Sequence, residues 1–440
     1  MSLLYQLFTS LAILALAPYY ALRGWRRGEP WQTLRERLGA VPPDIAAACS
    51  GGGAIWIHAV SVGEVLAAQP VVEGLRVRFP GRPIFVSTTT ETGQRLARER
   101  LKSASGVFYF PLDSTGAVRR ALRSIRPAMV IVMETEIWPN FLREARQAGV
   151  PVAFANARIS ERSFARYKRW KFLLEDFFTE ALWNAELFLA QTDRDAARLT
   201  EMGAEPERVI VTGNLKYDAE PPALGRFGTW LAEQIKSQER WPVVVAGSVV
   251  EREEEAVLAA YDTVQRQWRR ALLILAPRKP DRFDDAAQMA ADAGWNVTRR
   301  SRLDLAAPLD ENTDVLVLDS IGELAAIYSL ADAAFVGGSL VKSGGHNILE
   351  PAWFGKPPVF GTSMENFAEM AQQFLAADAG IQVISGAQLG KVCVQLIEND
   401  ALREKMGRAA RELSARNAGA TGRTLDRISR TLASPQGGSA

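Results

Sequence analysis

Cysteine and histidine are scarce in this chain of 440 residues, which contains two of each. Two distant cysteines, Cys49 and Cys393, cannot make a disulfide framework, and two histidines, His58 and His346, cannot make a His-rich metal site. An excess of charge of one sign is also lacking, since 52 Lys and Arg residues oppose 50 Asp and Glu residues. This balance excludes a globally basic nucleic-acid-binding protein.

Two common nucleotide-binding signatures are missing as well. The sequence has no GxxxxGK[ST] phosphate loop and no GxGxxG after a predicted strand, which disfavours an ATPase and an ordinary dehydrogenase. Asp193-Arg194-Asp195 resembles a metal-binding DxD sequence, but it follows a predicted strand and opens a predicted helix. An N-cap and a first-turn aspartate explain these carboxylates more simply.

The first 22 residues contain no Asp, Glu, Lys, Arg or His. A helix of this length reaches about 33 Å, enough to cross a bilayer core of about 30 Å. We expect residues 1–22 to form a spanning membrane anchor; an interfacial helix and a cleaved signal peptide are the alternatives. Arg23, Arg26 and Arg27 follow at once, which favours the cytoplasmic side for this flank and for the rest of the chain.

Short apolar runs alternate with longer amphipathic stretches from Gly53 onward, a pattern typical of parallel βαβ units. The runs lack polar alternation, as expected of strands that are covered on both faces. We predict strands at 54–59, 83–87, 107–110, 129–133, 152–156, 187–190, 242–246, 272–276, 315–318, 334–336 and 358–360.

The fold class predicted from this pattern is α/β, with two Rossmann-like doubly wound domains that face each other across a cleft. Their expected bounds are 23–215 and 242–433. The stretch 216–241 contains prolines and polar residues and is expected to be the linker, and the tail 434–440 is expected to be disordered. Ligands of such sheets bind beyond the carboxyl ends of the strands, so the loops there are the candidate sites.

The segment 58–64, HAVSVGE, leaves the first predicted strand and enters a helix. Because proline is tolerated near a helix start, Pro70 suggests that Glu64 lies in the loop or the first turn, where its carboxylate could accept a proton from a bound hydroxyl. A first-turn glutamate that only complements the helix dipole is the alternative. We expect His58 to be a structural strand residue, since the spacing implies no adjacent nucleophile or carboxylate.

Glu134 and Glu136 follow the strongly apolar strand predicted at 129–133. The two carboxylates are one residue apart in the sequence beyond a strand end, so they should point in different directions. We expect one of them to serve the site and the other to cap the following helix.

Four loops in the second half follow predicted strands and combine glycines, cations and helix-opening acids. Glycines at strand ends let backbone N–H groups approach phosphate oxygens. We expect a phosphate cradle formed by Gly337, Gly338, Ser339, Gly344 and Gly345. Arg278 would be a fixed cation beside it, and Glu350 could accept hydrogen bonds from ribose hydroxyls. Together the loops predict nucleotide binding.

The stretch 158–171, RISERSFARYKRWK, has six basic residues and one acid, with three aromatic residues interleaved. The basic residues are Arg158, Arg162, Arg166, Lys168, Arg169 and Lys171, and the last aromatic residue is Trp170. Near a membrane anchor, this composition predicts docking to anionic lipid or to a phosphorylated lipid substrate. A solvated helix with its aromatic side in the core is the alternative.

Seven segments resemble, in this order, the Kdo (3-deoxy-D-manno-oct-2-ulosonic acid) transferase family of lipopolysaccharide synthesis. They are SVGE at 61–64, METEIWPN at 133–140, FANARIS at 154–160, TGNLKYD at 212–218, PRKPDRF at 277–283, GEL at 322–324 and FVGGSLVKSGGHNILEP at 335–351. The resemblance covers nearly the whole chain, including the anchor.

This resemblance implies a GT-B glycosyltransferase that is inverting and needs no metal or other cofactor. It would move Kdo from CMP-Kdo to the 6-hydroxyl of a lipid A precursor at the cytoplasmic face of the inner membrane. The general base would be Glu64, and Glu134 and Lys216 would assist the transition state. The implied CMP contacts are Pro277, Arg278, Ile321, Gly322, Glu323, Asn347, Ile348, Leu349 and Glu350.

Two positions depart from the family pattern. Ile348 stands where proline is common, and Val249-Val250-Glu251-Arg252 stands where a Thr-His-Glu-Gly-like run is common, which leaves the role of that loop open. Two other functions remain as alternatives: a sugar-nucleotide 2-epimerase, which resembles this architecture without an anchor, and a non-catalytic, membrane-tethered nucleotide-binding module.

Overall fold

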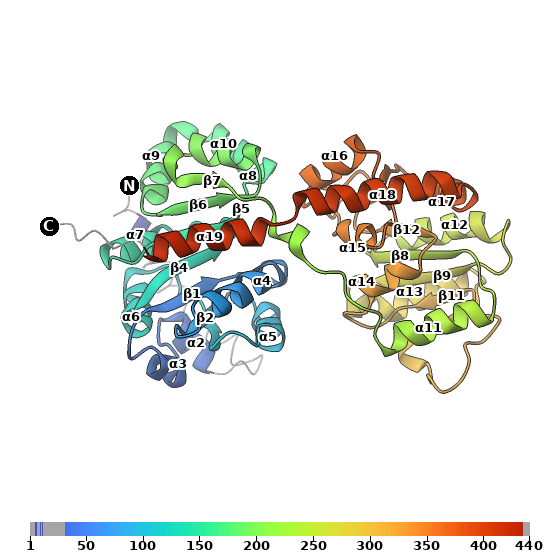
Figure 1. Cartoon of the computed structure of the whole chain (residues 1–440), viewed down its shortest axis with the longest axis horizontal. Coiled ribbons are helices and arrows are strands. Elements are labelled where there is room, and N and C mark those ends of the chain that lie inside the picture. Colours follow the sequence, from blue (N-terminus) through green and yellow to red (C-terminus); the bar gives the residue numbers. More distant parts are fainter. Residues whose placement is uncertain (1–4, 7–8, 10, 12–30, 434–440) are drawn as a thin grey trace. The chain divides into compact units, whose positions relative to one another are not determined.

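The computed structural model describes residues 5, 6, 9, 11 and 31–433. Apart from the four single positions, the predicted anchor at 1–22 lies outside the described residues, as does the predicted tail at 434–440. Within the described part, no helix is long and apolar enough to cross a membrane. The chain divides into two compact units: unit 1 contains Met1–Ala219 and Ala418–Ala440, and unit 2 contains Glu220–Asn417 (Figure 1).

Unit 1 is built on a seven-stranded sheet in the order β3-β2-β1-β4-β5-β6-β7, in which all neighbours are parallel. Its strands are β1 (Ala54–His58), β2 (Ile84–Thr88), β3 (Gly106–Tyr109), β4 (Pro127–Met133), β5 (Val152–Ala157), β6 (Leu187–Ala190) and β7 (Val209–Val211). Its helices are α2 (Trp31–Arg37), α3 (Pro43–Ala48), α4 (Val62–Arg78), α5 (Glu91–Arg100), α6 (Thr115–Ile125), α7 (Pro139–Gln147), α8 (Glu161–Arg169), α9 (Lys171–Trp183), α10 (Asp193–Glu201), η1 (Pro206–Arg208), η2 (Leu215–Asp218) and α19 (Ala420–Ala433).

Helices cover both faces of this sheet, which explains why its strands are continuously apolar. Successive residues of β1 point to opposite faces. Trp56 enters a core cluster with Phe85 and Phe154, and Ile57 enters a second cluster with Ile131. The carboxyl ends of β1, β4 and β5, which are neighbours in the sheet, therefore lie at one edge.

Unit 2 contains a second seven-stranded parallel sheet, in the order β10-β11-β9-β8-β12-β13-β14. Its strands are β8 (Val243–Val249), β9 (Leu272–Pro277), β10 (Val297–Arg299), β11 (Val315–Val317), β12 (Ala333–Val336), β13 (Pro358–Phe360) and β14 (Ile381–Gln382). Its helices are α11 (Arg226–Ser237), α12 (Glu254–Gln265), η3 (Pro280–Arg282), α13 (Phe283–Asp292), η4 (Arg300–Arg302), α14 (Leu324–Ile327), η5 (Tyr328–Leu330), α15 (Leu349–Trp353), α16 (Ala368–Ala376), α17 (Gly386–Glu398) and α18 (Asp400–Asn417).

All of the predicted strands are confirmed, with small differences at their ends. The sequence pattern does not predict β7, β10 and β14, which have three, three and two residues. Each of them is the edge strand of its sheet. Their residues are partly exposed rather than buried, so they do not form an apolar run that the sequence would reveal.

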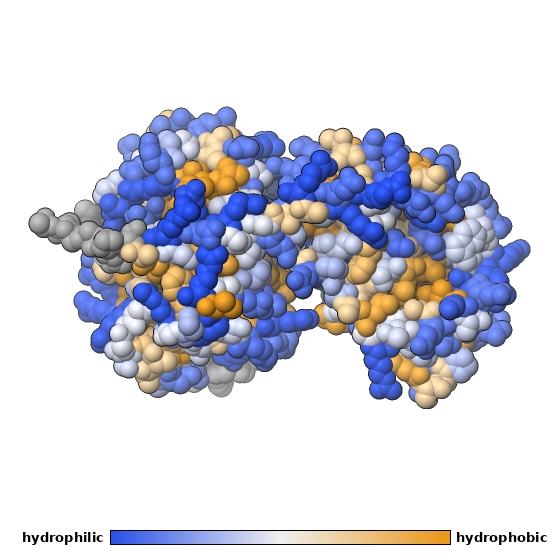
Figure 2. All heavy atoms as spheres, in the orientation of Figure 1, coloured by the Kyte–Doolittle hydropathy of each residue, from blue (hydrophilic) through white to orange (hydrophobic). Residues whose placement is uncertain are grey.

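The predicted domain bounds need two corrections. The boundary follows Ala219 rather than residue 215, and α11, inside the predicted linker, belongs to unit 2. The last helix, α19, belongs to unit 1 rather than to the second domain, because Leu425 and Ile428 are buried in the same core cluster as Ile57. On the face shown in Figure 2, hydrophilic side chains cover most of both units and hydrophobic ones show in small separate patches.

Candidate active site

Glu64 lies in the first turn of α4, as predicted, although Pro70 lies inside the helix rather than at its start. Ser61 is the N-cap residue, and its side chain accepts a hydrogen bond from the N–H of Glu64. The carboxylate of Glu64 accepts in turn from Oγ of Ser61 at 2.9 Å and from the N–H of Val60 at 2.8 Å. These bonds resemble a capping box, although the carboxylate accepts from the N–H of the residue before the N-cap, so Glu64 also stabilises the start of α4.

The pKa of Glu64 is raised from 4.5 to about 7. Burial of the side chain, which is 6% exposed, is the largest cause, and the carboxylates of Glu134 and Glu136 raise it further. The two hydrogen bonds from Val60 and Ser61 act in the opposite direction. A carboxyl group that titrates near neutral pH is suited to accept a proton from a substrate hydroxyl.

Glu134 directly follows β4 and has a φ of +54°, in the left-handed region that residues other than glycine rarely adopt. Its N–H donates a hydrogen bond to the C=O of Ala155, at the end of the neighbouring strand β5. Backbone strain of this kind collects at functional sites, where the surrounding structure holds it in place.

Glu136 does not cap α7, so that part of the prediction is wrong. The N-cap position is Trp138, and the carboxylate of Asp113 instead accepts hydrogen bonds from the N–H groups of Asn140 and Phe141 in the first turn. The pKa of Glu136 is raised by burial and by the charge of Glu134. Three carboxylates, from Glu64, Glu134 and Glu136, therefore influence one another at this edge of the sheet.

Lys216 lies on η2 and brings a cation to these carboxylates. Its Nζ is 3.8 Å from Oε1 of Glu134. Burial lowers the pKa of Lys216 and Arg158 lowers it further, whereas Glu134 and Glu64 raise it. The structure thus brings together the three residues predicted to carry the chemistry of the first domain: Glu64, Glu134 and Lys216.

Asn156 is a residue of this site that the sequence analysis did not single out. It is the second-last residue of β5 and has a φ of +58°. Its Oδ1 accepts a hydrogen bond from the N–H of Leu215, the first residue of η2. Its side chain is fully buried, and its Nδ2 makes no hydrogen bond within the described residues. Two signals for it were available in the sequence: its place at the end of a predicted strand and its position in the FANARIS segment.

Arg158 belongs to this edge and not to the basic helix. Its backbone N–H and C=O both bond to Oγ1 of Thr135, at 2.9 Å and 2.6 Å, and its charge acts on Lys216. Thr135 follows Glu134, so these bonds connect the segments that leave β4 and β5.

The basic helix α8 has both an exposed basic surface and an aromatic side that is buried in the core. Phe164 and Tyr167 are buried in the core, whereas Arg162, Arg166, Lys168, Arg169 and Trp170 are exposed. Lys168 lies 3.5 Å from Glu201, and the guanidinium of Arg169 lies over the ring of Trp170. Trp170 and Phe172, which are 45% and 77% exposed, add apolar surface beside these cations.

In unit 2, three of the predicted donor residues, Arg278, Asn347 and Glu350, influence one another, and His346 lies near Arg278 as well. Arg278 follows β9, and its N–H donates to the C=O of Val249 at the end of β8. Burial lowers the pKa of His346 to about 4, with a further contribution from Arg278. Burial also raises the pKa of Glu350 to about 7, against the effect of Arg278 and of a hydrogen bond with Asn347.

The glycine turn after β12 holds a carboxylate of the protein itself. Glu253 is fully buried, and its Oε1 accepts from the N–H groups of Ser339 and Leu340 at 2.8 Å and 2.7 Å. Its Oε2 accepts from Gly338 at 2.6 Å and from Val250 at 3.1 Å. Four backbone donors thus compensate one buried charge.

This arrangement corrects the predicted phosphate cradle. The N–H groups of Gly337, Gly344 and Gly345 also bond to protein oxygens, those of Gly247, Ser363 and Gly338. All five predicted donors, Gly337, Gly338, Ser339, Gly344 and Gly345, are therefore engaged within unit 2. The variant loop at 249–252 leads directly into Glu253, which the sequence analysis did not consider.

The remaining predicted CMP contacts differ in what they can offer. Glu323 forms two hydrogen bonds of 3.1 Å with Arg300, so its carboxylate is already paired. Ile321 is 78% exposed and precedes Gly322, which has a φ of +94°. The side chains of Ile348 and Leu349 are fully buried. Ile348 and Leu349 can therefore contact a bound CMP-sugar only through their backbone.

Three residues considered in the sequence analysis, His58, Asp193 and Asp195, have structural positions. His58 is buried with its Nδ1 3.0 Å from Oγ of Ser87, and burial lowers its pKa to about 3. Thr192, rather than Asp193, is the N-cap of α10, and Asp195 accepts a hydrogen bond from the N–H of Ile159. Among the described residues, no group of three or more His, Cys, Asp or Glu side chains is placed to hold a metal ion.

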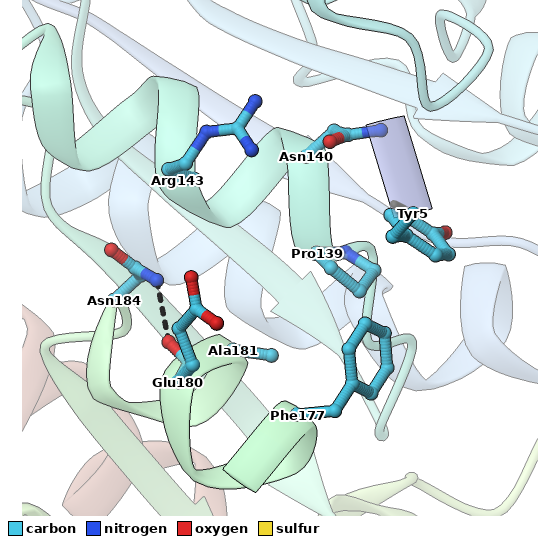
Figure 3. Close-up of a pocket in the computed structure, with 8 residues that line it drawn as sticks. All are labelled: Tyr5, Pro139, Asn140, Arg143, Phe177, Glu180, Ala181 and Asn184. Carbon is cyan, nitrogen blue, oxygen red and sulfur yellow. Dashed lines mark hydrogen bonds between the residues drawn. The ribbon is translucent and has the colours of Figure 1, made fainter. Parts of the chain in front are cut away.

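Two cavities in unit 1 are lined by other residues than Glu64, Glu134 and Lys216. The one in Figure 3 is lined by Tyr5, Phe177 and residues at the start of α7, and its volume of about 10 Å³ is that of a single water. A wider groove of about 660 Å³ lies at the start of β4, beside Arg119, Arg123 and Arg126.

Comparison with known proteins identifies relatives across the whole chain. A sequence model of the family described as 3-deoxy-D-manno-octulosonic-acid transferase (kdotransferase) matches residues 32–219. The 3-deoxy-D-manno-octulosonic acid transferase of Bordetella pertussis is 37% identical over 437 residues, covering 95% of this chain and 97% of the relative. The enzyme of the same name from Haemophilus influenzae is 34% identical over 398 residues, covering 90% of each chain.

Solved structures are similar in fold. The UDP-GlcNAc 2-epimerase of Neisseria meningitidis, solved with UDP-GlcNAc, superimposes with a TM-score of 0.54 at 15% identity, over 86% of this chain and 99% of that chain. At this identity the similarity concerns the architecture alone. The GT-B-like arrangement of two parallel-sheet α/β units is thereby supported.

Proposed function

The chain belongs to the 3-deoxy-D-manno-octulosonic acid (Kdo) transferase family, and from this premise we propose that it transfers Kdo from CMP-Kdo to the 6-hydroxyl of a lipid A precursor. In this proposal unit 1 binds the acceptor and unit 2 binds the donor. Family membership also decides against the two alternatives, an epimerase and a non-catalytic module. The observation that carries the mechanism is the raised pKa of Glu64, at a strand end and beside a second carboxylate and a lysine.

Glu64 acts as the general base. Its carboxylate removes the proton of the acceptor hydroxyl while the hydroxyl oxygen attacks the anomeric carbon of Kdo. The bond from that carbon to the phosphate oxygen breaks, CMP leaves with the electron pair, and the anomeric configuration inverts. The hydroxyl of Ser61, which now donates to Oε1 of Glu64, marks the position where a substrate hydroxyl can bond to the same oxygen.

Lys216 and Glu134 assist this step as a pair. The ammonium group of Lys216 offsets the negative charge of the carboxylates and stabilises the charge that develops on the leaving phosphate. Glu134 holds that ammonium group at 3.8 Å and helps to keep the pKa of Glu64 high. Because the leaving group is a phosphodiester that is already activated, no metal ion is needed in this mechanism.

Unit 2 binds CMP through side chains at the carboxyl ends of its strands. Arg278 is the cation for the phosphate, since the backbone N–H groups of the glycine turn bond to Glu253. Glu350 accepts hydrogen bonds from the ribose hydroxyls, and the backbone of 321–322 and 347–349 contacts the base. Pro277 fixes the path of the chain into Arg278 as the last residue of β9.

The protein acts at the cytoplasmic face of the inner membrane in this proposal. Residues 1–22 anchor it there, and the exposed cations of α8, with Trp170 and Phe172, lie against anionic headgroups and the phosphates of the acceptor. The buried aromatic side of the same helix keeps this surface rigid.

The test uses purified full-length protein with CMP-Kdo and a tetra-acylated lipid A precursor, in the presence of EDTA. We expect release of CMP that depends on the lipid, and a lipid product heavier by one or more Kdo residues in mass spectrometry. CMP release without a change in lipid mass would contradict the proposed transfer. Full loss of transfer in EDTA would contradict the proposal that no metal ion is needed.

A further inference from the structure

The turn that carries Lys216 is joined to the start of the last helix of the chain. The carboxylate of Asp218, the last residue of η2, accepts a hydrogen bond from the N–H of Gly419 at 2.5 Å and another from the N–H of Thr421. These donors belong to the first turn of α19 and to the residue before it. Asp218 thus caps a helix that lies more than 200 residues away in the sequence.

The same helix is packed firmly against unit 1. Arg423 donates from Nε to the C=O of Thr212 at 2.8 Å, and the hydroxyls of Thr424 and Thr212 are 3.2 Å apart in the core. Ala420 and Ile428 are fully buried in the cluster that also contains Leu215, the residue before Lys216. The helix therefore fixes η2 from two directions, through a carboxylate cap and through apolar packing.

The helix also contacts α4, which carries Glu64 (Figure 1). A Cβ atom at Gly74 of α4 would lie 2.2 Å from Cδ1 of Leu425, so the two helices approach as closely as only a glycine permits. Arg78, the last residue of α4, forms an ion pair with Asp426 of α19 at 2.7 Å. One helix thus lies against both elements that present the proposed catalytic groups, α4 and η2.

We propose that Asp218 is a positioning residue. By capping α19 it attaches η2 to that helix, and the attached turn holds Lys216 beside Glu134. The role of Lys216 in this inference rests on the proposed function. The cap fixes the backbone of η2 at its last residue, and Asn156 fixes it at its first through the N–H of Leu215. With both ends held, the ammonium group of Lys216 is confined near the carboxylates despite the flexible side chain.

The first experiment compares Asp218→Ala and Asp218→Asn with the wild-type chain in the Kdo transfer assay. We expect Asp218→Ala to lower kcat at least tenfold while the affinity for CMP changes less than twofold, because the donor residues are in unit 2. Asparagine keeps one acceptor oxygen, so Asp218→Asn should recover a substantial part of kcat. A kcat of Asp218→Ala within twofold of wild type would overturn the inference.

A matched control distinguishes the positioning of Lys216 from a general weakening of the packing of α19 on unit 1. Arg78→Ala removes an ion pair with Asp426, in the middle of α19, and leaves the cap at the start of the helix intact. We expect this variant to keep kcat within twofold even where its melting temperature falls as much as that of Asp218→Ala. An equal loss of kcat in both variants would show that only helix docking matters, and would refute the specific role of Asp218.

A third measurement does not depend on the catalytic assignment. Lys216 is partly buried beside Glu134, so an amine-directed acylating reagent should modify it slowly, as followed by peptide mass spectrometry. We expect Asp218→Ala to speed the labelling of Lys216 at least fivefold, with Lys236 of α11 unchanged as the internal reference. Unchanged labelling overturns the positioning role; faster labelling without any Kdo transfer by the wild type would leave that role standing and refute the proposed function alone.

Discussion

Nζ of Lys216 lies 3.8 Å from Oε1 of Glu134, and the two side chains are 20% and 23% exposed. Lys216 therefore brings a cation to an edge of the sheet that also carries Glu64 and Glu136, and Arg158 acts on the same lysine. Burial is the largest cause of the raised pKa of Glu64, and the charges of Glu134 and Glu136 raise it further. A pKa near neutral pH is the property that a general base requires.

Replacing Glu64 tests the base assignment directly. Glu64→Gln keeps the size of the side chain and one acceptor oxygen for the N–H of Val60, but it cannot take a proton. We expect kcat for Kdo transfer to fall at least about a hundredfold, in the range typical of a lost general base, while CMP binding and the melting temperature stay near wild type. Ser61→Ala serves as the control, since it loses a cap but keeps the base. Substantial transfer by Glu64→Gln would refute the assignment.

The pH dependence follows from the raised pKa of Glu64. Below about pH 7 the carboxyl group is protonated and cannot act as a base, so kcat/KM should fall about tenfold per pH unit as the pH decreases from there. The same group binds its proton more tightly in the folded state than in the unfolded chain. Its contribution to stability is therefore full below about pH 4.5 and is lost as the pH rises through about 7.

Removing a neighbouring charge should move this pH profile. Glu136→Gln deletes one of the charges that raise the pKa of Glu64, so the midpoint of the kcat/KM profile should shift to lower pH. The exposed Glu99 of α5 provides a control, because Glu99→Gln removes the same charge far from the cluster in the sequence and at the surface. A midpoint that stays in place in Glu136→Gln would show that a group other than Glu64 sets the profile.

Glu253 should be essential for the shape of unit 2. In Glu253→Gln an amide NH2 replaces one carboxylate oxygen, so at least two of the four backbone N–H groups lose their acceptor. We expect the free energy of unfolding to fall by about 3 kcal/mol or more, and CMP to bind at least about tenfold more weakly. Urea denaturation and CMP titration measure the two effects. The exposed neighbour Glu251, as Glu251→Gln, should change neither, and unchanged CMP binding in Glu253→Gln would separate Glu253 from the donor site.

The basic surface of α8 can be tested with vesicles. Neutralising Arg166, Lys168 and Arg169 together to Gln should weaken binding to vesicles that contain phosphatidylglycerol by up to about 3 kcal/mol, and should raise the KM for the lipid acceptor. The exposed residues Lys405, Arg408 and Arg416 of α18 offer a control with the same change in net charge. An unchanged KM, or an equal loss of vesicle binding in the control, would assign α8 to the scaffold alone.

The sequence by itself determined the two α/β units and the position of the site. Short apolar runs that alternate with helix-length segments are typical of parallel strands covered on both faces, and ligands of such sheets bind in the loops beyond the carboxyl ends of the strands. Glu64 and Glu134 were accessible in this way because each lies just beyond a predicted strand, whereas Lys216 was indicated only by the resemblance of the TGNLKYD segment to the family. The resemblance of the ordered motifs to Kdo transferases extended this to the family, which the comparison with relatives then showed.

Only the tertiary structure decided which groups meet. Glu253 fills the glycine turn, Asp113 rather than Glu136 caps α7, and α19 returns to unit 1 to be capped by Asp218. Each is a contact between segments that are apart in the sequence, in which a carboxylate accepts hydrogen bonds from backbone N–H groups of another segment. Local pattern carries no information about such pairings. The hydrogen-bonding needs of the backbone at turns and helix starts, satisfied by carboxylates from other segments, therefore set the details of both sites.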